Sequence, residues 1–163
     1  MTGNDLINLY EYSFGAIKRN LDGVSNEETL LSPQPSGNCM NWVLGHLVLA
    51  RNLAITLAGA GPMNGRELLD RYGRGTEPLK PGEAPADLAT LRGILEDSQL
   101  QLLPALAAIS DEALAAEVPE ALKRPPLVGN VGNAIARMNA HENYHNGQLG
   151  MLRRLVGREG AIR

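Results

Sequence analysis

Apolar residues recur at three- and four-residue steps along four stretches of the chain, which is the spacing of one face of an α-helix. These stripes predict helices at about residues 5–20, 38–58, 85–109 and 131–156. No alternating apolar segment of strand length, bounded by hairpin turns, accompanies them. Four amphipathic helices need one shared core, so the pattern predicts an all-α fold, a four-helix bundle.

Residues at the helix ends refine these bounds. Ser36 or Asn38 is expected to cap the second helix, and Pro85 suits the first turn of the third. Pro104 removes a hydrogen bond inside the third helix, so a kink or a break is expected there. Gly157 suits the left-handed residue beyond the last helix.

Two long connections hold most of the prolines. Residues 59–84 and 110–130 are expected to cross the ends of the bundle, and a short helix (GRELLDRY, residues 65–72) is expected in the first of them. A chain of 163 residues buries about 70% of its unfolded surface on folding, enough for a core without disulfides or a structural metal. We therefore expect one domain over residues 1–163.

The composition of the chain disfavours nucleic acid and membranes as partners. The net charge of −3 provides no basic surface for nucleic acid or an anionic membrane. The longest apolar run, WVLGHLVLA, is too short to span a bilayer, and the first residues lack the pattern of a secretory signal. The single cysteine, Cys39, cannot form an internal disulfide and reads as a small core residue. A cytoplasmic protein is expected.

The chain has three histidines, and all of them lie on apolar stripes. His141 and His145 are four residues apart and project from one helical face, so both imidazoles can reach one ion. His46 lies on the second helix, one turn after Trp42. If the second and fourth helices pack together, three imidazoles hold a metal and leave a coordination position open. Buried histidines that merely form hydrogen bonds are the alternative, but burying unpaired imidazoles is costly, which favours the metal.

The stretch HENYH also matches H-E-x-x-H, the zinc-protease signature, with Glu142 as the base. The surrounding sequence excludes that interpretation. Gln148 and Met151 occupy the positions where the extended motif needs Gly and His, and Glu159 is the one carboxylate that follows. Such proteases also bind substrate along an edge strand, and no strand is predicted.

Two segments together are more informative than either alone. NWVLGHLVLARN (41–52) contains W-x-x-x-H, and AHENYHNGQLGMLRRL (140–155) contains H-x-x-x-H followed by G-Q. In their order and spacing they resemble the DinB/YfiT-like family of metal-dependent proteins, and the resemblance covers most of the chain. The residues that carry it are Trp42, His46, His141, His145, Gly147 and Gln148.

The resemblance implies a four-helix bundle, often a homodimer, in which the three histidines hold nickel or zinc. Some relatives use a low-molecular-weight thiol, such as mycothiol or bacillithiol, in isomerase or S-transferase reactions. We therefore expect a metal-dependent enzyme of this kind acting on a small-molecule substrate. The alternatives are a metal-dependent hydrolase with Glu142 as base, and a non-catalytic dimer that binds a metal or another ligand.

Four further residues are candidates for the site, each with a plainer interpretation. Glu142 flanks the histidine stripe and could act as a base, although a solvated surface glutamate is commoner. Gln148 could hydrogen-bond to a ligand histidine, or lie at a helix seam. Arg137 could bind a substrate carboxylate or be solvated, and Trp42 could wall the pocket or belong to the core.

Overall fold

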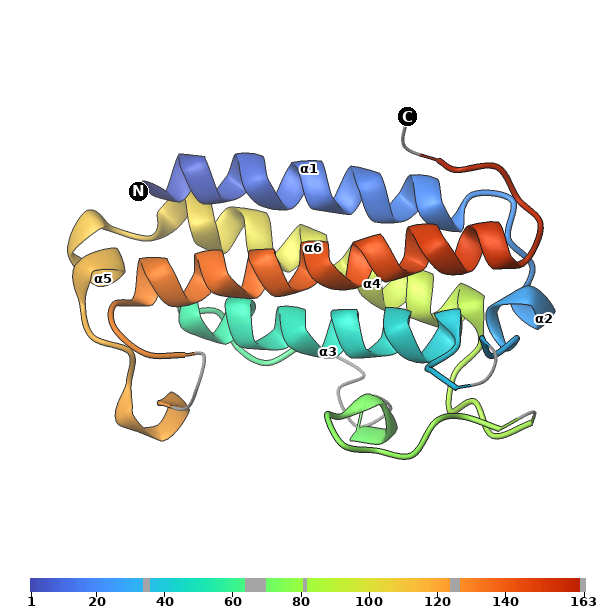
Figure 1. Ribbon diagram of the computed structural model, residues 1–163. Helices are drawn as coiled ribbons and strands as arrows, with labels where there is room; N and C mark the ends of the chain where they lie inside the picture. Colours follow the sequence, from blue (N-terminus) through green and yellow to red (C-terminus); the bar gives the residue numbers. More distant parts are fainter. Residues whose placement is uncertain (34–35, 64–69, 81, 124–126, 162–163) are drawn as a thin grey trace.

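The computed structural model describes residues 1–33, 36–63, 70–80, 82–123 and 127–161. Its four long helices, shown in Figure 1, are α1 (Gly3–Leu21), α3 (Met40–Leu57), α4 (Leu88–Ala108) and α6 (Val131–Leu155). Between them lie α2 (Asn26–Thr29), α5 (Asp111–Ala115) and the short 3-10 helix η2 (Glu120–Leu122). These residues contain no β-strand, so the predicted all-α bundle is confirmed. None of the described helices is both long and apolar enough for a bilayer crossing.

The long helices occupy the corners of a square in the order α1, α6, α3, α4, each packing against its two neighbours. Figure 1 shows α1 and α6 running in one direction and α3 and α4 in the other. Since α3 and α4 are parallel neighbours, the connection between them must return along the length of the bundle. The predicted long crossover connection is therefore confirmed, but it runs along the bundle, and the expectation that residues 59–84 cross the end of the bundle is wrong.

The predicted helix bounds are close, and the largest difference is at the start of α4, at residue 88 instead of 85. Asp87 caps α4 by accepting a hydrogen bond from the Thr90 amide (2.8 Å), so Pro85 lies outside the helix. Cys39 precedes α3 without any side-chain cap, so the cap expected from Ser36 or Asn38 is wrong.

Pro104 does not break α4, which continues to Ala108. Its ring is on the exposed side of the helix, and Leu100, whose carbonyl loses its helical donor, is 75% exposed. Water can take the place of the missing N–H there, so of the kink or break expected at Pro104 the break does not occur. Gly157 has φ 80° after α6, as predicted. Most of the predicted helix at 65–72 lies outside the described residues, and 70–72 form a helical turn.

A buried ion pair lies at the centre of the bundle. Arg51 on α3 donates from Nε to Glu142 Oε2 (2.7 Å) and from Nη2 to Oε1 (2.9 Å), and both side chains are 1% exposed. Ser13 on α1 donates to Glu142 Oε1 (2.5 Å). Arg51 Nη1 donates to Gln99 Oε1 (2.7 Å) and Ser98 Oγ (3.2 Å) on α4. All four long helices meet in this network, and the expectation that Glu142 is a solvated surface residue is wrong.

The ion pair predicts a specific pattern of stability. Removing one partner of a buried pair leaves the other charge unpaired at a cost of about 3–5 kcal/mol, whereas replacing both by apolar residues is often neutral. We expect Glu142→Ala to lower the free energy of unfolding by about that amount, and Arg51→Met/Glu142→Leu to recover most of it. Urea denaturation followed by circular dichroism measures both.

The surface pair between Lys18 and Glu96 is the control, since it also joins two long helices, at 3.4 Å, but its side chains are 55% and 54% exposed. Glu96→Ala should change the free energy of unfolding by less than about 1 kcal/mol. Equal effects of Glu142→Ala and Glu96→Ala would contradict the central role of the buried pair.

Candidate metal centre

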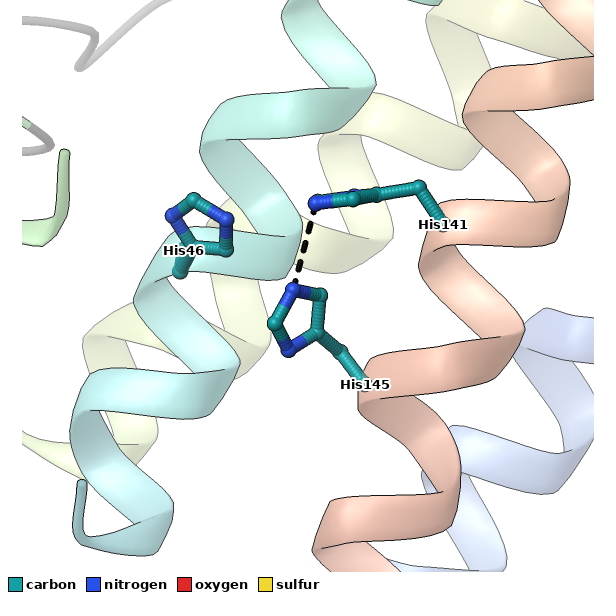
Figure 2. Close-up of side chains that lie close together, drawn as sticks. All are labelled: His46, His141 and His145. Carbon is teal, nitrogen blue, oxygen red and sulfur yellow. Dashed lines mark hydrogen bonds between the residues drawn. The ribbon is translucent and has the colours of Figure 1, made fainter. Parts of the chain in front are cut away.

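The packing of α3 against α6 brings the three histidines together (Figure 2). Ring centroids are 5.2 Å apart for His46 and His141, 4.8 Å for His46 and His145, and 4.5 Å for His141 and His145. One ring nitrogen from each lies within 4.8 Å of the others. Two histidines from one helix and one from its neighbour therefore converge, as the sequence predicted.

A glutamine fixes the proton on His145. Its Nδ1 lies 2.7 Å from Gln148 Oε1, so the expected hydrogen bond between these side chains is present. An amide oxygen only accepts, so Nδ1 carries the proton and Nε2 keeps a free lone pair. That Nε2 is the atom on the side of His141. Gln148 thus leaves His145 in the tautomer that a metal ligand at Nε2 requires.

The chain that connects α3 to α4 fixes the proton on His46 in the same way. Its Nδ1 donates to the backbone carbonyl of Tyr72 (2.7 Å), which leaves the lone pair on Nε2. The ring also stacks on Trp42, with centroids 4.8 Å apart and planes 10° from parallel. Trp42 is 6% exposed and donates from Nε1 to Thr76 Oγ1 (3.0 Å). Trp42 is therefore both a core residue and the surface that orients a ligand ring.

Gly45, next to His46, lets the crossover approach α3 this closely. A Cβ at residue 45 would overlap the ring of Tyr72. The Tyr72 hydroxyl in turn donates to Asn41 Oδ1 on α3 (2.9 Å). The absence of a side chain at Gly45 therefore allows Tyr72 to place its carbonyl against His46.

His141 is the residue whose polar atoms are not satisfied. Its Nε2 lies 3.2 Å from Nε2 of His145, and its Nδ1 is buried without a hydrogen-bond partner among the described residues. If Nε2 of His141 carries the proton, the buried Nδ1 lone pair lacks a donor. If Nδ1 carries it, two lone pairs face each other at Nε2.

A cation bound by both Nε2 atoms relieves the repulsion in the second arrangement, because each lone pair then has a positive partner; Nδ1–H of His141 keeps no acceptor among the described residues. Two nitrogens that bind one tetrahedral zinc at about 2.0–2.1 Å lie about 3.3 Å apart. The 3.2 Å between the Nε2 atoms of His141 and His145 matches that separation. These two nitrogens therefore fit one divalent metal ion, and a ring nitrogen of His46 within 4.8 Å of them is the third donor at hand.

Burial also keeps these rings neutral, the form that binds a metal. Desolvation, together with the neighbouring His145 and His46, lowers the pKa of His141 to about 4. Desolvation lowers the pKa of His46 against the opposing effect of the Tyr72 carbonyl, and lowers the pKa of His145 against that of Gln148.

The remaining candidates lie elsewhere or play other parts. Glu142 is not among the grouped metal-type ligands of the described chain, and its carboxylate is held by Arg51 and Ser13. Arg137 is exposed near the start of α6 and donates to the Val128 carbonyl (2.7 Å).

Sequence reasoning missed three residues of the site. Tyr72 ends a helical turn and Thr76 lies in the irregular segment after it, and nothing in the sequence marks either residue as part of the site. Tyr144, 66% exposed, packs edge-on against His145 with centroids 5.1 Å apart. Its position beside a predicted ligand was the one available signal.

The lowered pKa values predict an acid-sensitive metal-free protein. The unfolded chain takes up protons at its histidines near pH 6.5, before the folded protein does, so stability falls as the pH drops from about 6.5 toward 4. We expect the melting temperature of chelator-treated protein to fall less steeply in His141→Gln over this range. Identical slopes in both proteins, measured by circular dichroism, would contradict the low pKa of His141.

Comparison with known proteins identifies the fold and the family of this chain. The structure is similar to the crystal structure of a conserved protein from Enterococcus faecalis, with a TM-score of 0.72 and 18% sequence identity over 96% of this chain and 98% of that one. At that identity the similarity shows the fold. No curated protein sequence matches this chain. The family model of the DinB superfamily matches residues 15–149, which is most of the chain, and the protein therefore belongs to the DinB superfamily.

Proposed function

We propose that this protein is a metal-dependent enzyme in which His46, His141 and His145 hold one divalent ion, zinc or nickel, that acts on a small-molecule substrate. The observation that carries the proposal is the convergence of three neutral imidazoles. In His46 and His145 a hydrogen bond from Nδ1 leaves the lone pair on Nε2. Membership of the DinB superfamily supports it.

Three nitrogen ligands leave a tetrahedral ion one position for an outside group, which is the arrangement of catalytic sites. An ion in this place would lower the pKa of a thiol or a water molecule bound at that position. The protein supplies the orientation. Gln148 and the Tyr72 carbonyl hold His145 and His46 by their outer nitrogens, and Trp42 shields one face of His46 from water.

Of the reactions open to such a site, we propose a thiol-dependent S-transfer or isomerisation that uses a low-molecular-weight thiol. Zinc and nickel accept thiolate as well as imidazole ligands. The hydrolase alternative needs a base near the ion, and Glu142 is a poor candidate, since Arg51 binds both its oxygens and Ser13 donates to one of them. The thiol reaction needs no carboxylate there.

A homodimer is part of the proposal. Leu9 and Tyr12 on α1 are large apolar residues that are 42% and 64% exposed. Apolar side chains exposed together on one helix are common at protein interfaces. A non-catalytic dimer that binds metal would share these features, so turnover is the property that separates it from the enzyme.

Metal content tests the centre directly. We expect about one equivalent of zinc or nickel in protein purified without a histidine tag, measured by elemental mass spectrometry. His46→Ala should lose tight binding because two ligands on one helix make a weak site, and Gln148→Ala should weaken it by about 10- to 100-fold.

Asn143→Ala is the matched control, because Asn143 lies between the two α6 ligands in sequence but bonds to Asn139 instead. Its metal affinity should equal that of the unmodified protein. Full metal content in His46→Ala would refute the three-histidine centre.

An activity screen of metal-loaded protein with bacillithiol, mycothiol and glutathione in parallel tests the reaction class. Turnover with one thiol, lost on chelation and restored by metal, is the expected result. Esterase or amidase turnover without any thiol would favour the hydrolase, and no turnover with full metal content would favour the non-catalytic protein.

A further inference from the structure

An apolar groove of about 520 Å³ begins beside the metal centre. It lies between the second half of α6 and the segment leading into α3. None of the described residues that line it is charged, and its polar side chains are Asn38, Gln148 and the hydroxyl-bearing Tyr144. The other side chains that form its walls are Pro33, Val43, Met151, Leu152 and Leu155.

Two lining residues connect the groove to the histidines. Gln148 accepts the hydrogen bond from Nδ1 of His145, and the Tyr144 ring packs against the ring of His145. The inner end of the groove is thus formed by side chains in contact with a metal ligand.

From there the groove follows α6 for roughly 15 Å, the rise of the ten residues from His145 to Leu155. A second hollow of about 190 Å³ shares Pro33, Leu152 and Leu155 with it at the far end, and its one charged lining residue, Glu28, is paired with Arg158. Gly147 forms part of the wall, and a Cβ placed there meets nothing within 4 Å. The groove is therefore elongated, and a larger side chain is accommodated at residue 147, on the edge between this groove and a hollow beside α1.

We propose that this groove binds the uncharged apolar arm, alkyl, acyl or aryl, of a ligand whose polar head binds at the metal centre. The binding of the polar head at the metal centre rests on the proposed function. The binding of the apolar arm rests on the shape and the lining of the groove. A volume of about 520 Å³ lies within the range of small-molecule sites, roughly 300–1,000 Å³. The lack of charged lining residues disfavours an ionic arm, because its charge would be desolvated without a partner.

A second copy of the chain is the other occupant to consider. Ten residues line the groove, whereas a stable protein interface uses about 20–30 on each side. The groove is also continuous with side chains that contact a metal ligand, which an extended arm explains and a subunit contact does not require. The small ligand is therefore the better match.

Hydroxamates of increasing length test the arm separately from the head, because all share one metal-binding group. We expect calorimetry on zinc-loaded protein to show affinity rising from acetohydroxamate to hexanohydroxamate and octanohydroxamate, by up to about fourfold per buried methylene. Gly147→Leu should bind acetohydroxamate within about twofold of the unmodified protein and lose the gain from the longer tails. Met151→Glu, which places a charge in the lining, should lose it too.

Gly93→Leu is the matched control. Gly93 is an exposed glycine inside α4 with nothing within 4 Å of an added Cβ, and it lies outside the groove. This variant should keep the full gain with tail length.

Hexan-1-ol, which has no metal-binding head, tests the groove in metal-free protein. It should shift the methyl resonance of Met151 in NMR spectra, and Gly147→Leu should abolish the shift. If acetohydroxamate fails to bind while hexan-1-ol binds, the open metal position fails and the groove stands.

Two results would overturn the groove assignment. One is an affinity that does not change with tail length, or that changes equally in Gly147→Leu. The other is sedimentation of the unmodified protein as a dimer and of Gly147→Leu as a monomer, which would show that a second copy covers the groove.

Discussion

The ion pair between Arg51 and Glu142 is the constraint on which the geometry of this bundle depends. Apolar side chains slide past one another at little cost, but a bidentate pair between buried side chains is satisfied in one register. Arg51 lies on the helix that carries His46, and Glu142 is next to His141. Fixing the pair therefore fixes the offset of α3 against α6, and with it the meeting of the three histidines.

The interior thus contains two kinds of polar cluster, close together but different in character. Around Glu142 each charge meets an opposite charge or a hydroxyl, and the network is complete within the protein. At the histidines, hydrogen bonds hold Nδ1 of His46 and of His145, the Nε2 atoms of His141 and His145 face each other, and Nδ1 of His141 is buried without a partner among the described residues. Buried polar groups left unsatisfied in an otherwise well-packed core are typical of functional sites.

Most of the fold could be predicted from the sequence because the helices are long and their apolar residues are periodic. The three histidines were readable because their spacing placed them on two facing stripes. The ion pair was missed, although the sequence contained a signal for it. Met40–Leu57 contains a single residue of the types Arg, Lys, Asp and Glu, which is Arg51. Val131–Leu155 contains a single acidic residue, which is Glu142.

The partners that orient His46 were not predictable in the same way. Tyr72 contributes a backbone carbonyl, which any residue possesses, and Thr76 lies in a segment without regular structure. Their positions depend on the path of the crossover, and that path is set by tertiary packing against Gly45 and Asn41, not by local periodicity.

The parallel course of α3 and α4 has a consequence for how such a protein can diversify. Two histidines of the cluster lie on α6, where Gln148 of the same helix orients His145, whereas His46 takes its orientation from the connecting chain. A change of length or composition in that connection can alter the tilt and basicity of His46 while the helical scaffold stays intact. Selection can therefore change the environment of His46 through the connecting chain and leave the four-helix scaffold as it is.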